Sequence, residues 1–258
     1  MSRVTFEISE LMSMKKYPKE LFYRGNLELL QRRKISIVGS RKPTKYSRML
    51  IQKLSSELAK GGVCVVSGGA MGIDATAHLG ASSANTIAVL PCGVDVRYPA
   101  VNKNLLESIE QSGLLLSQFE NGFKASPWSF VVRNELVVAL GDVLVVGEAE
   151  IQSGTMRSVE FALAMGKEIF VLPQRLGESC GTNRLLKEKK AEAIYDIEAF
   201  AARFWDRAVM VEKKEDAFLL FCATNPTYDA ALAKFPQRVF EAELSGEIEV
   251  VNGTIRLA

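Results

Sequence analysis

Small residues and arginines gather where three apolar segments of the chain end. Short apolar strands that lead through glycine into a helix place backbone N–H groups at the helix N-terminus, where phosphate binds well. We therefore expect a phosphate-binding edge that serves either a nucleotide cofactor or a nucleic-acid backbone. In chain order, the three turns are Gly39-Ser40-Arg41, Ser67-Gly68-Gly69 and Ser153-Gly154-Thr155.

Basic side chains surround the first of these turns. From Gln31 to Lys53 the chain has eight Lys and Arg residues and no Asp or Glu. Arg41, Lys42 and Lys45 follow a predicted strand, at the edge where open α/β sheets bind ligands. Cations at a helix N-terminus are unfavourable unless an anion offsets them, so we expect these three side chains to bind an anion. A solvated helix face is the alternative interpretation.

A second group of candidate residues lies in the predicted helix 126–140. Phe130 and Arg133 are three residues apart and share one helix face, with Asn134 beside them. A ring next to a guanidinium suits stacking on a nucleobase and pairing with its phosphate. The alternative places Phe130 in the core and Arg133 in a salt bridge. Glu148, after a later strand, is either a catalytic acid or a group that caps or orients its neighbours.

The signatures of common nucleotide enzymes are incomplete. Ser67 stands where a dinucleotide-binding G-x-G-x-x-G motif needs its first glycine, and no P-loop motif occurs. His78 is the single histidine, which argues against Ser-His-Asp and Cys-His catalysis. The four cysteines are widely separated, which argues against a zinc site or a disulfide framework. We therefore expect no catalytic residue, no metal and no cofactor.

The composition is that of an ordinary globular protein. The 258 residues carry a formal net charge of +2, so a nucleic-acid partner must be held by a local basic patch. No uncharged run approaches the roughly 20 residues of a membrane span. The N-terminus lacks the apolar core of a secretory signal. We expect a cytoplasmic protein without a membrane contact.

Apolar segments alternate with helical segments through most of the chain. The apolar segments are rich in Val, Ile and Leu on both faces, which indicates parallel strands covered on two sides. The predicted fold class is α/β, with an extended Rossmann-like, mostly parallel sheet covered by helices on both faces. The predicted strands are 34–40, 63–69, 86–92, 114–119, 143–149, 168–173 and 193–196. The predicted helices are 44–60, 72–83, 101–112, 126–140, 154–166 and 181–190.

The pattern changes after Trp205. The last part of the chain predicts short helices followed by a hairpin around Asn252-Gly253, a strong turn signal. This order is typical of a winged-helix-like module, and its acidic composition favours protein interaction or packing over DNA binding. We expect three parts: an N-terminal arm over 1–25, a Rossmann-like DNA-binding domain over 26–207 and a small C-terminal winged-helix-like domain over 208–258.

Several separate motifs follow one another along the chain. They are Ile37-Val38-Gly39-Ser40-Arg41, Val65 to Asp74 with Ala77-His78, Thr86 to Leu90 with Cys92-Gly93, Tyr98-Pro99, Phe130 with Arg133-Asn134, Ser153-Gly154-Thr155 and Gly181-Thr182-Asn183. Together they resemble the DNA-processing protein A (DprA, also called Smf) family of bacterial natural transformation. The resemblance implies a homodimer that binds single-stranded DNA without sequence preference, protects incoming DNA and helps to load RecA recombinase. It also implies that the protein is not an enzyme.

The expected DNA site combines the resemblance with the residue patterns. Arg41, Arg133 and nearby lysines would neutralise phosphates, and Phe130 would stack on bases at about 1–3 kcal/mol each. Glu135 stands where the family usually has an arginine, which puts an acid close to the expected groove. The expected DNA-binding residues are Gly39, Ser40, Arg41, Lys42, Lys45, Ser67, Gly68, Gly69, Phe130, Arg133, Asn134, Ser153, Gly154 and Thr155.

Two other functions stay open at this point. Nucleotide-binding Rossmann enzymes of the nucleoside-monophosphate phosphoribohydrolase type resemble this fold and use a G-G-x-G-T-x-x-E motif. Ser158 stands where that glutamate should be, although glycosidic hydrolysis needs a carboxylate. The third possibility is a scaffold whose glycines serve tight turns alone.

Overall fold

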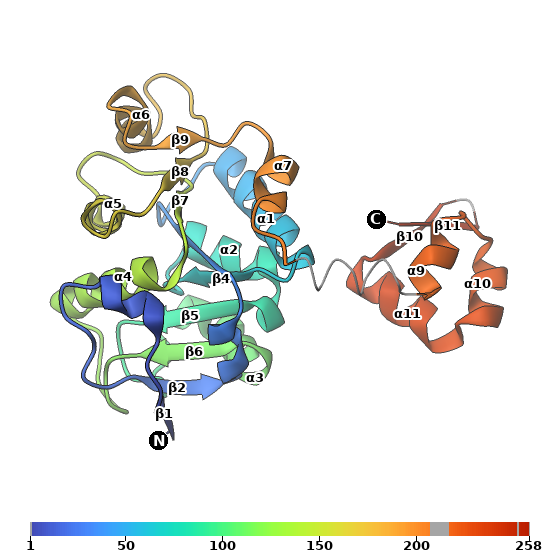
Figure 1. Ribbon diagram of the computed structural model, residues 1–258, viewed down its shortest axis with the longest axis horizontal. Helices are drawn as coiled ribbons and strands as arrows, with labels where there is room; N and C mark the ends of the chain where they lie inside the picture. The colour runs from blue at the N-terminus through green and yellow to red at the C-terminus, as the bar shows by residue number, and fades with distance from the viewer. Residues whose placement is uncertain (1, 207–216, 252, 258) are drawn as a thin grey trace. The chain divides into compact units, whose positions relative to one another are not determined.

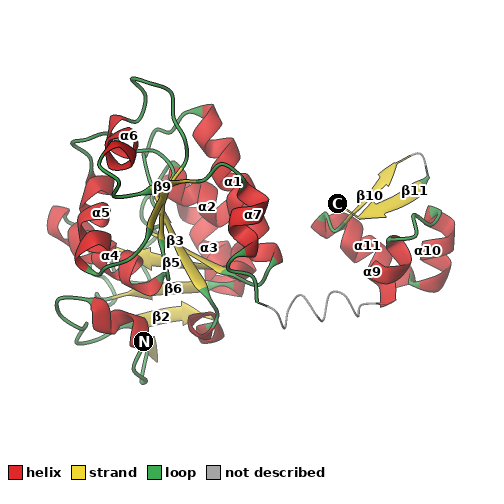
Figure 2. Ribbon diagram, turned by 45° about the horizontal axis from the view of Figure 1, so that its top comes forward, coloured by secondary structure: helices red, strands yellow, loops and turns green. Residues whose placement is uncertain are grey.

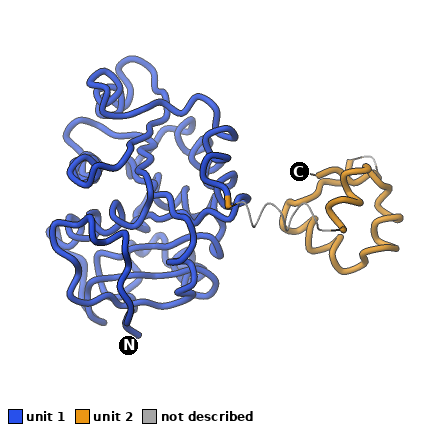
Figure 3. The backbone as a smooth tube through the Cα atoms, viewed as in Figure 1, with its two compact units in different colours: residues 1–205 blue, residues 206–258 orange. Residues whose placement is uncertain are grey.

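A computed structural model describes residues 2–206, 217–251 and 253–257. The chain forms two compact units, residues 1–205 and 206–258 (Figure 3). The predicted boundary after residue 207 lies outside the described residues. The predicted N-terminal arm belongs to the first unit, and two of its segments are strands of the main sheet.

The described part of the first unit is built on a nine-stranded sheet with the order β1-β2-β6-β5-β4-β3-β7-β8-β9 (Figure 1). Strands β3 to β9 are parallel, and β1 and β2 add an antiparallel edge next to β6. The mostly parallel sheet is therefore confirmed. The strands are β1 (Ser2–Arg3), β2 (Phe22–Gly25), β3 (Lys34–Val38), β4 (Cys64–Ser67), β5 (Thr86–Leu90), β6 (Leu114–Ser117), β7 (Leu144–Val146), β8 (Ile169–Val171) and β9 (Glu192–Ala193).

Helices cover both faces of this sheet, as predicted (Figure 2). One face packs against α1, α2, α3 and α7, and Ile51 and Leu54 of α1 belong to one buried cluster with Ile35 and Ile37 of β3. The other face packs against α4, α5 and α6. The helices are α1 (Lys45–Lys60), α2 (Ile73–Ala81), α3 (Lys103–Ser112), α4 (Pro127–Leu140), α5 (Gly154–Ala164), α6 (Cys180–Lys187) and α7 (Ile197–Ala202), with short 3₁₀ helices η1 (Ser9–Ser13), η2 (Leu27–Gln31), η3 (Ser83–Asn85) and η4 (Ala100–Asn102).

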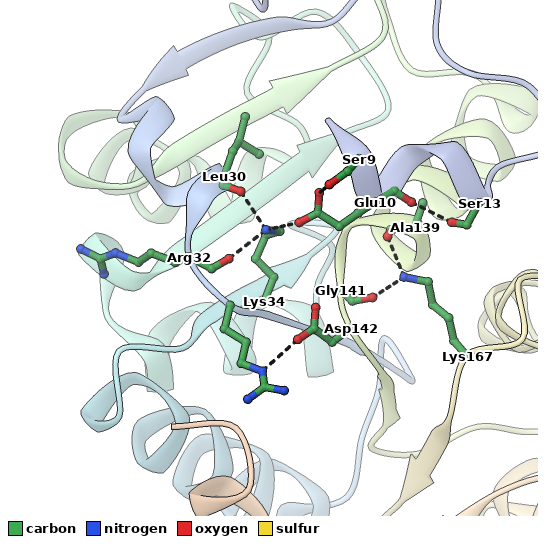
Figure 4. Close-up of polar contacts among 11 residues, drawn as sticks. Ser9, Glu10, Ser13, Leu30, Arg32, Lys34, Ala139, Gly141, Asp142 and Lys167 are labelled. Atoms are coloured by element: carbon green, nitrogen blue, oxygen red, sulfur yellow. Dashed lines mark hydrogen bonds and ion pairs between the residues drawn. The ribbon is translucent and has the colours of Figure 1, made fainter. Parts of the chain in front are cut away.

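A buried lysine fastens the N-terminal segment to the amino end of β3. The side chain of Lys34 is 2% exposed, and its ammonium donates to the carbonyl oxygens of Leu30 and Arg32, both at 2.8 Å. It also forms a 2.5 Å ion pair with Glu10 of η1 (Figure 4). Burial raises the pKa of Glu10, but its hydrogen bonds, above all the one to Lys34, and the charge of Lys34 together outweigh burial and leave that pKa below its usual value. Because η1 packs against α4, this ion pair fixes the position of the N-terminal segment that contacts α4.

The second unit follows the predicted order of short helices and a hairpin. Its core contains Phe218, Val239, Ala242, Ile248 and Ile255. Gly253 has a φ of 73°, the left-handed conformation that such a hairpin turn needs, while Asn252 lies outside the described residues. The described elements are α9 (Ala217–Cys222), α10 (Tyr228–Lys234), α11 (Pro236–Ser245), β10 (Ile248–Val251) and β11 (Thr254–Leu257).

Candidate nucleic-acid interface

A groove opens where the strand order of the sheet reverses. The chain proceeds from β3 to β4 on one side and from β7 to β8 on the other, so the carboxyl ends of β3 and β7 diverge into a crevice. Open α/β sheets bind ligands at this point. The groove has a volume of about 590 Å³ and lies between the N-terminal halves of α4 and α5. It is lined by Val38, Gly39, Ser40, Arg41, Ala70, Asp74, Tyr98, Pro127, Phe130, Val131, Arg133, Asn134, Ala149, Glu150, Ser153, Gly154, Thr155, Arg157 and Ser158.

Nine of the fourteen predicted site residues line this groove. Lys42 and Lys45 are exposed at the start of α1 and do not line it. Ser67, Gly68 and Gly69 are buried and do not line it, although Gly68 lines a smaller adjoining cavity with Arg41, Phe130 and Arg133. The nine are Gly39, Ser40, Arg41, Phe130, Arg133, Asn134, Ser153, Gly154 and Thr155.

The ring of Phe130 pairs with an arginine other than the expected one. The guanidinium carbon of Arg41 lies 5.3 Å from the centre of the Phe130 ring. The ring of Tyr98 meets Phe130 edge-on, with the two ring centres 5.8 Å apart. Arg41 is exposed and Phe130 is half-buried. An exposed cation beside a partly open ring provides a charge for a phosphate and a flat surface for a base.

Arg133 is buried, so its expected role as a direct phosphate ligand needs correction. The residue is 4% exposed. Its guanidinium donates to the carbonyl oxygens of Gly68 and Val89 and, through Nε, to the side chain of Asn134 at 3.1 Å. Burial lowers its pKa, and the nearby carboxylate of Asp74 opposes that shift. Arg133 therefore supports the Ser67-Gly68-Gly69 turn through hydrogen bonds inside the protein. Its charge also makes the groove more positive.

An internal carboxylate occupies the N–H groups of the second glycine turn. The carboxylate of Asp74, in the first turn of α2, accepts the N–H groups of Gly68 at 3.2 Å and Ala70 at 3.4 Å. Burial raises the pKa of Asp74, while Arg133 and these N–H groups oppose that rise. The hydroxyl of Ser67 donates to the carbonyl oxygen of Ile37 at 2.6 Å. Asp74 therefore already supplies an anion to the N–H groups of Gly68 and Ala70, and DNA binding by Ser67, Gly68 and Gly69 stays a prediction.

The third turn, Ser153-Gly154-Thr155, leads into the N-terminus of a helix, as the sequence predicts. Ser153 precedes α5, and its hydroxyl donates to the carbonyl oxygen of Glu150 at 2.7 Å instead of capping the helix. Gly154 is exposed, with no atom of the described chain within 4 Å of where a Cβ would stand. The start of α5 thus faces the groove without a side-chain cap, which suits an incoming anion.

Glu148 and Glu135, whose roles the sequence did not decide, both accept hydrogen bonds within the protein. Glu148 accepts the N–H group of Thr44 at 2.9 Å and its hydroxyl at 3.0 Å, just before α1. Glu135 accepts the N–H group of Lys15 at 3.2 Å and does not line the groove. Glu148 therefore orients α1, and Glu135 faces the N-terminal segment.

Some groove residues were missed by sequence reasoning. Tyr98 and Arg157 line the groove, and Arg157 also pairs with Glu160 at 2.8 Å. Tyr98 lies in the loop between β5 and η4, and no spacing signal links it to Phe130. Among the residues described, no three His, Cys, Asp or Glu side chains are grouped so as to hold a metal ion. Within the same residues, no helix has the length and apolar character to cross a membrane.

Comparison with known proteins assigns the chain to a family. The family described as DNA recombination-mediator protein A matches residues 7–204, more than half of the chain. The chain belongs to this family. DNA processing protein DprA of Streptococcus pneumoniae is 36% identical over 175 residues, which cover 66% of this chain and 62% of that protein. The chain spans less than two thirds of the length of the curated relatives that it matches.

Two solved structures of the family share the fold. DNA processing protein A of Helicobacter pylori, described for its single-stranded DNA binding mode, is 40% identical with a TM-score of 0.77, and the match covers 78% of this chain and 94% of that one. DprA of Streptococcus pneumoniae is 33% identical with a TM-score of 0.71, and the match covers 77% of this chain and 71% of that one. The predicted fold class, a mostly parallel sheet covered by helices, is thereby confirmed.

Proposed function

We propose that the groove binds single-stranded DNA without sequence preference. The observation that carries this proposal is the Arg41–Phe130 pair, an exposed cation against an accessible ring at the mouth of the groove. Support comes from the Helicobacter pylori relative, which was described for its binding of single-stranded DNA. The same combination of ring and cation is what sequence-tolerant single-strand sites use.

In this mechanism, the ring and the charges take different parts of the strand. A base stacks on Phe130, which accepts any base because each presents a π-face. Arg41 neutralises a phosphate, and the buried charge of Arg133 strengthens the positive field without touching the strand. The uncapped start of α5 receives a second phosphate. Because these contacts go to phosphates and to the faces of bases, we expect affinity to depend on salt more than on sequence.

The wider role is also a proposal. We infer a cytoplasmic homodimer that protects incoming DNA during natural transformation and helps to load RecA recombinase. The match to the DNA recombination-mediator protein A family supports it. Two grooves in one dimer would hold one strand together, which raises avidity through effective concentration.

We also propose that the chain is not an enzyme. The glutamate of the phosphoribohydrolase motif is replaced by Ser158, which is buried at the groove wall. The described carboxylates of the groove are Asp74, which is bonded to the glycine turn, and Glu150. Incubation with nucleoside monophosphates should release no free base, and release at an enzymatic rate would favour the hydrolase.

A binding titration tests the proposed function. Single strands of oligo-dT, oligo-dA and mixed sequence, and a duplex of the same length, are titrated at several salt concentrations. We expect the single strands to bind with affinities within about tenfold of one another and with a steep salt dependence. Binding that favours the duplex, or one sequence far above the others, would refute the proposal.

A further inference from the structure

Three cations near the start of α1 have no acidic partner among the described residues. Lys42, Lys45 and Arg48 are exposed, and none of them pairs with an acid in the ranges that the structure describes. The first turn of α1 has no acidic residue. Farther along the same helix, Lys53 pairs with Glu198 at 2.5 Å. Cations are unfavourable near a helix N-terminus, and Glu148, which accepts hydrogen bonds from Thr44 at this end, forms no ion pair with any of the three in the described chain, so a bound anion would stabilise this group.

Apolar side chains are interspersed with these cations. Met49 is 59% exposed and Tyr46 is 45% exposed. Lys45, Arg48 and Met49 follow the i, i+3, i+4 spacing and therefore share one face of α1. A single-stranded nucleic acid binds protein surfaces where positive side chains contact its phosphates and neighbouring apolar or aromatic side chains contact its bases.

The start of α1 follows the groove-lining turn closely in the chain. Arg41 lines the groove and directly precedes Lys42, whose N–H group donates to the hydroxyl of Ser40 at 3.1 Å. A strand that leaves the groove past Arg41 therefore reaches Lys42 first, and α1 next. Proximity in the chain and charge together favour a nucleic acid over an acidic protein as the occupant.

We propose that Lys42, Lys45, Arg48 and Met49 form an outer track for single-stranded DNA that leaves the groove. The proposal rests on the proposed function of the groove. The three cations bind successive phosphates, and Met49 contacts a base. The outer track adds affinity for strands that are longer than the groove and adds nothing for strands that end inside it.

Strand length separates the outer track from the groove. Wild type, the double variant K45Q/R48Q, the groove variant R41A and the control K53Q are titrated with oligo-dT of roughly 4 and roughly 16 nucleotides, which bracket the site sizes of single-strand binding folds. Lys53 is matched because it lies on the same helix but is already paired with Glu198. Thermal melts check that each variant is folded, which we expect because the substituted side chains are exposed.

We expect K45Q/R48Q to bind the short strand like wild type and to lose most of the gain from the longer strand. Its salt slope on the longer strand should fall by about 1.4, since each lost phosphate contact on a single strand contributes about 0.7. K53Q should match wild type on both strands. Wild-type affinity and slope for K45Q/R48Q on the longer strand would overturn the outer track, as would an equal loss on both strands. If wild type fails to bind the short strand, or R41A binds it unchanged, the groove assignment itself fails.

Discussion

The guanidinium of Arg41 lies against the ring of Phe130, with 5.3 Å between its central carbon and the ring centre. Arg41 follows β3 and Phe130 lies in the second turn of α4, so the pair joins the two sides of the groove mouth. A base that stacks on Phe130 is thereby brought next to a cation that can bind its phosphate. The residues that recognise the two parts of a nucleotide are far apart in sequence and adjacent in the fold.

Replacement of Arg133 should destabilise the protein. In R133M, the carbonyl oxygens of Gly68 and Val89 lose their buried donor and Asp74 loses a nearby positive charge, and a buried group left without its hydrogen-bond partner typically costs about 1–3 kcal/mol. R41A removes an exposed side chain and should change the free energy of unfolding by about 0.5 kcal/mol or less. Urea denaturation measures both. Equal stability of R133M and wild type would contradict the bracing role of Arg133.

Two glycines of the predicted phosphate turns should respond oppositely to alanine. A Cβ on Gly68 would overlap Nη1 of Arg133 and stand 2.7 Å from Oδ2 of Asp74, so G68A must displace two buried charged side chains. A Cβ on Gly154 meets no described atom within 4 Å. We expect G68A to lower the urea midpoint clearly and G154A to keep or slightly raise it, because alanine reduces the entropy of the unfolded chain. A urea midpoint for G154A below that for G68A would contradict the surroundings described for these two glycines.

The single histidine should make stability depend on pH. His78 is fully buried with Nδ1 2.6 Å from the hydroxyl of Thr86, and burial, assisted by Arg133, lowers its pKa to about 3. Its pKa in the unfolded chain is about 6.5, so the unfolded state binds more protons between these values. The resulting stabilisation is complete above about pH 6.5 and is lost as the pH falls toward 3.

The size of this effect follows from the two pKa values. Between pH 7 and pH 5, His78 should contribute a loss of about 2 kcal/mol in the free energy of unfolding. The variant H78Q is less stable but lacks this titration, so the wild-type curve minus the H78Q curve isolates it. A difference between the two proteins that stays constant from pH 7 to pH 5 would contradict a neutral, buried His78.

The sequence predicted the parallel core of the fold well. Long Val, Ile and Leu segments that end at glycine mark strands with both faces buried, and β3 to β8 lie inside the predicted segments. The antiparallel β2 was predicted as part of an arm. Its four residues, Phe22–Gly25, are too few to show a period, and their pairing with β6 depends on contacts across more than 80 residues of chain.

The candidate site was predicted in part. The turns at Gly39 and Gly154 were found because glycine before a helix is a local signal. Helix spacing placed Phe130 and Arg133 on one face, but spacing does not state which residue faces the interior. Nor does it show that Asp74 occupies the second turn, or that Arg41 supplies the cation for Phe130. These relations are set by tertiary packing, which brings together segments that no local pattern connects.

The measurement that tests the groove most directly is fluorescence anisotropy of a labelled mixed-sequence single strand with wild type, F130A, R41A and R33A. Arg33 is the matched control because its guanidinium lies 5.4 Å from the ring of Phe204 and pairs with Asp142. We expect F130A to lose about 1–3 kcal/mol of binding free energy on every sequence, since stacking is sequence-tolerant. R41A should reduce the salt slope by about 0.7, and R33A should match wild type. If F130A and R41A, both folded, bind with wild-type affinity and salt slope, the groove is not the site of single-stranded DNA binding.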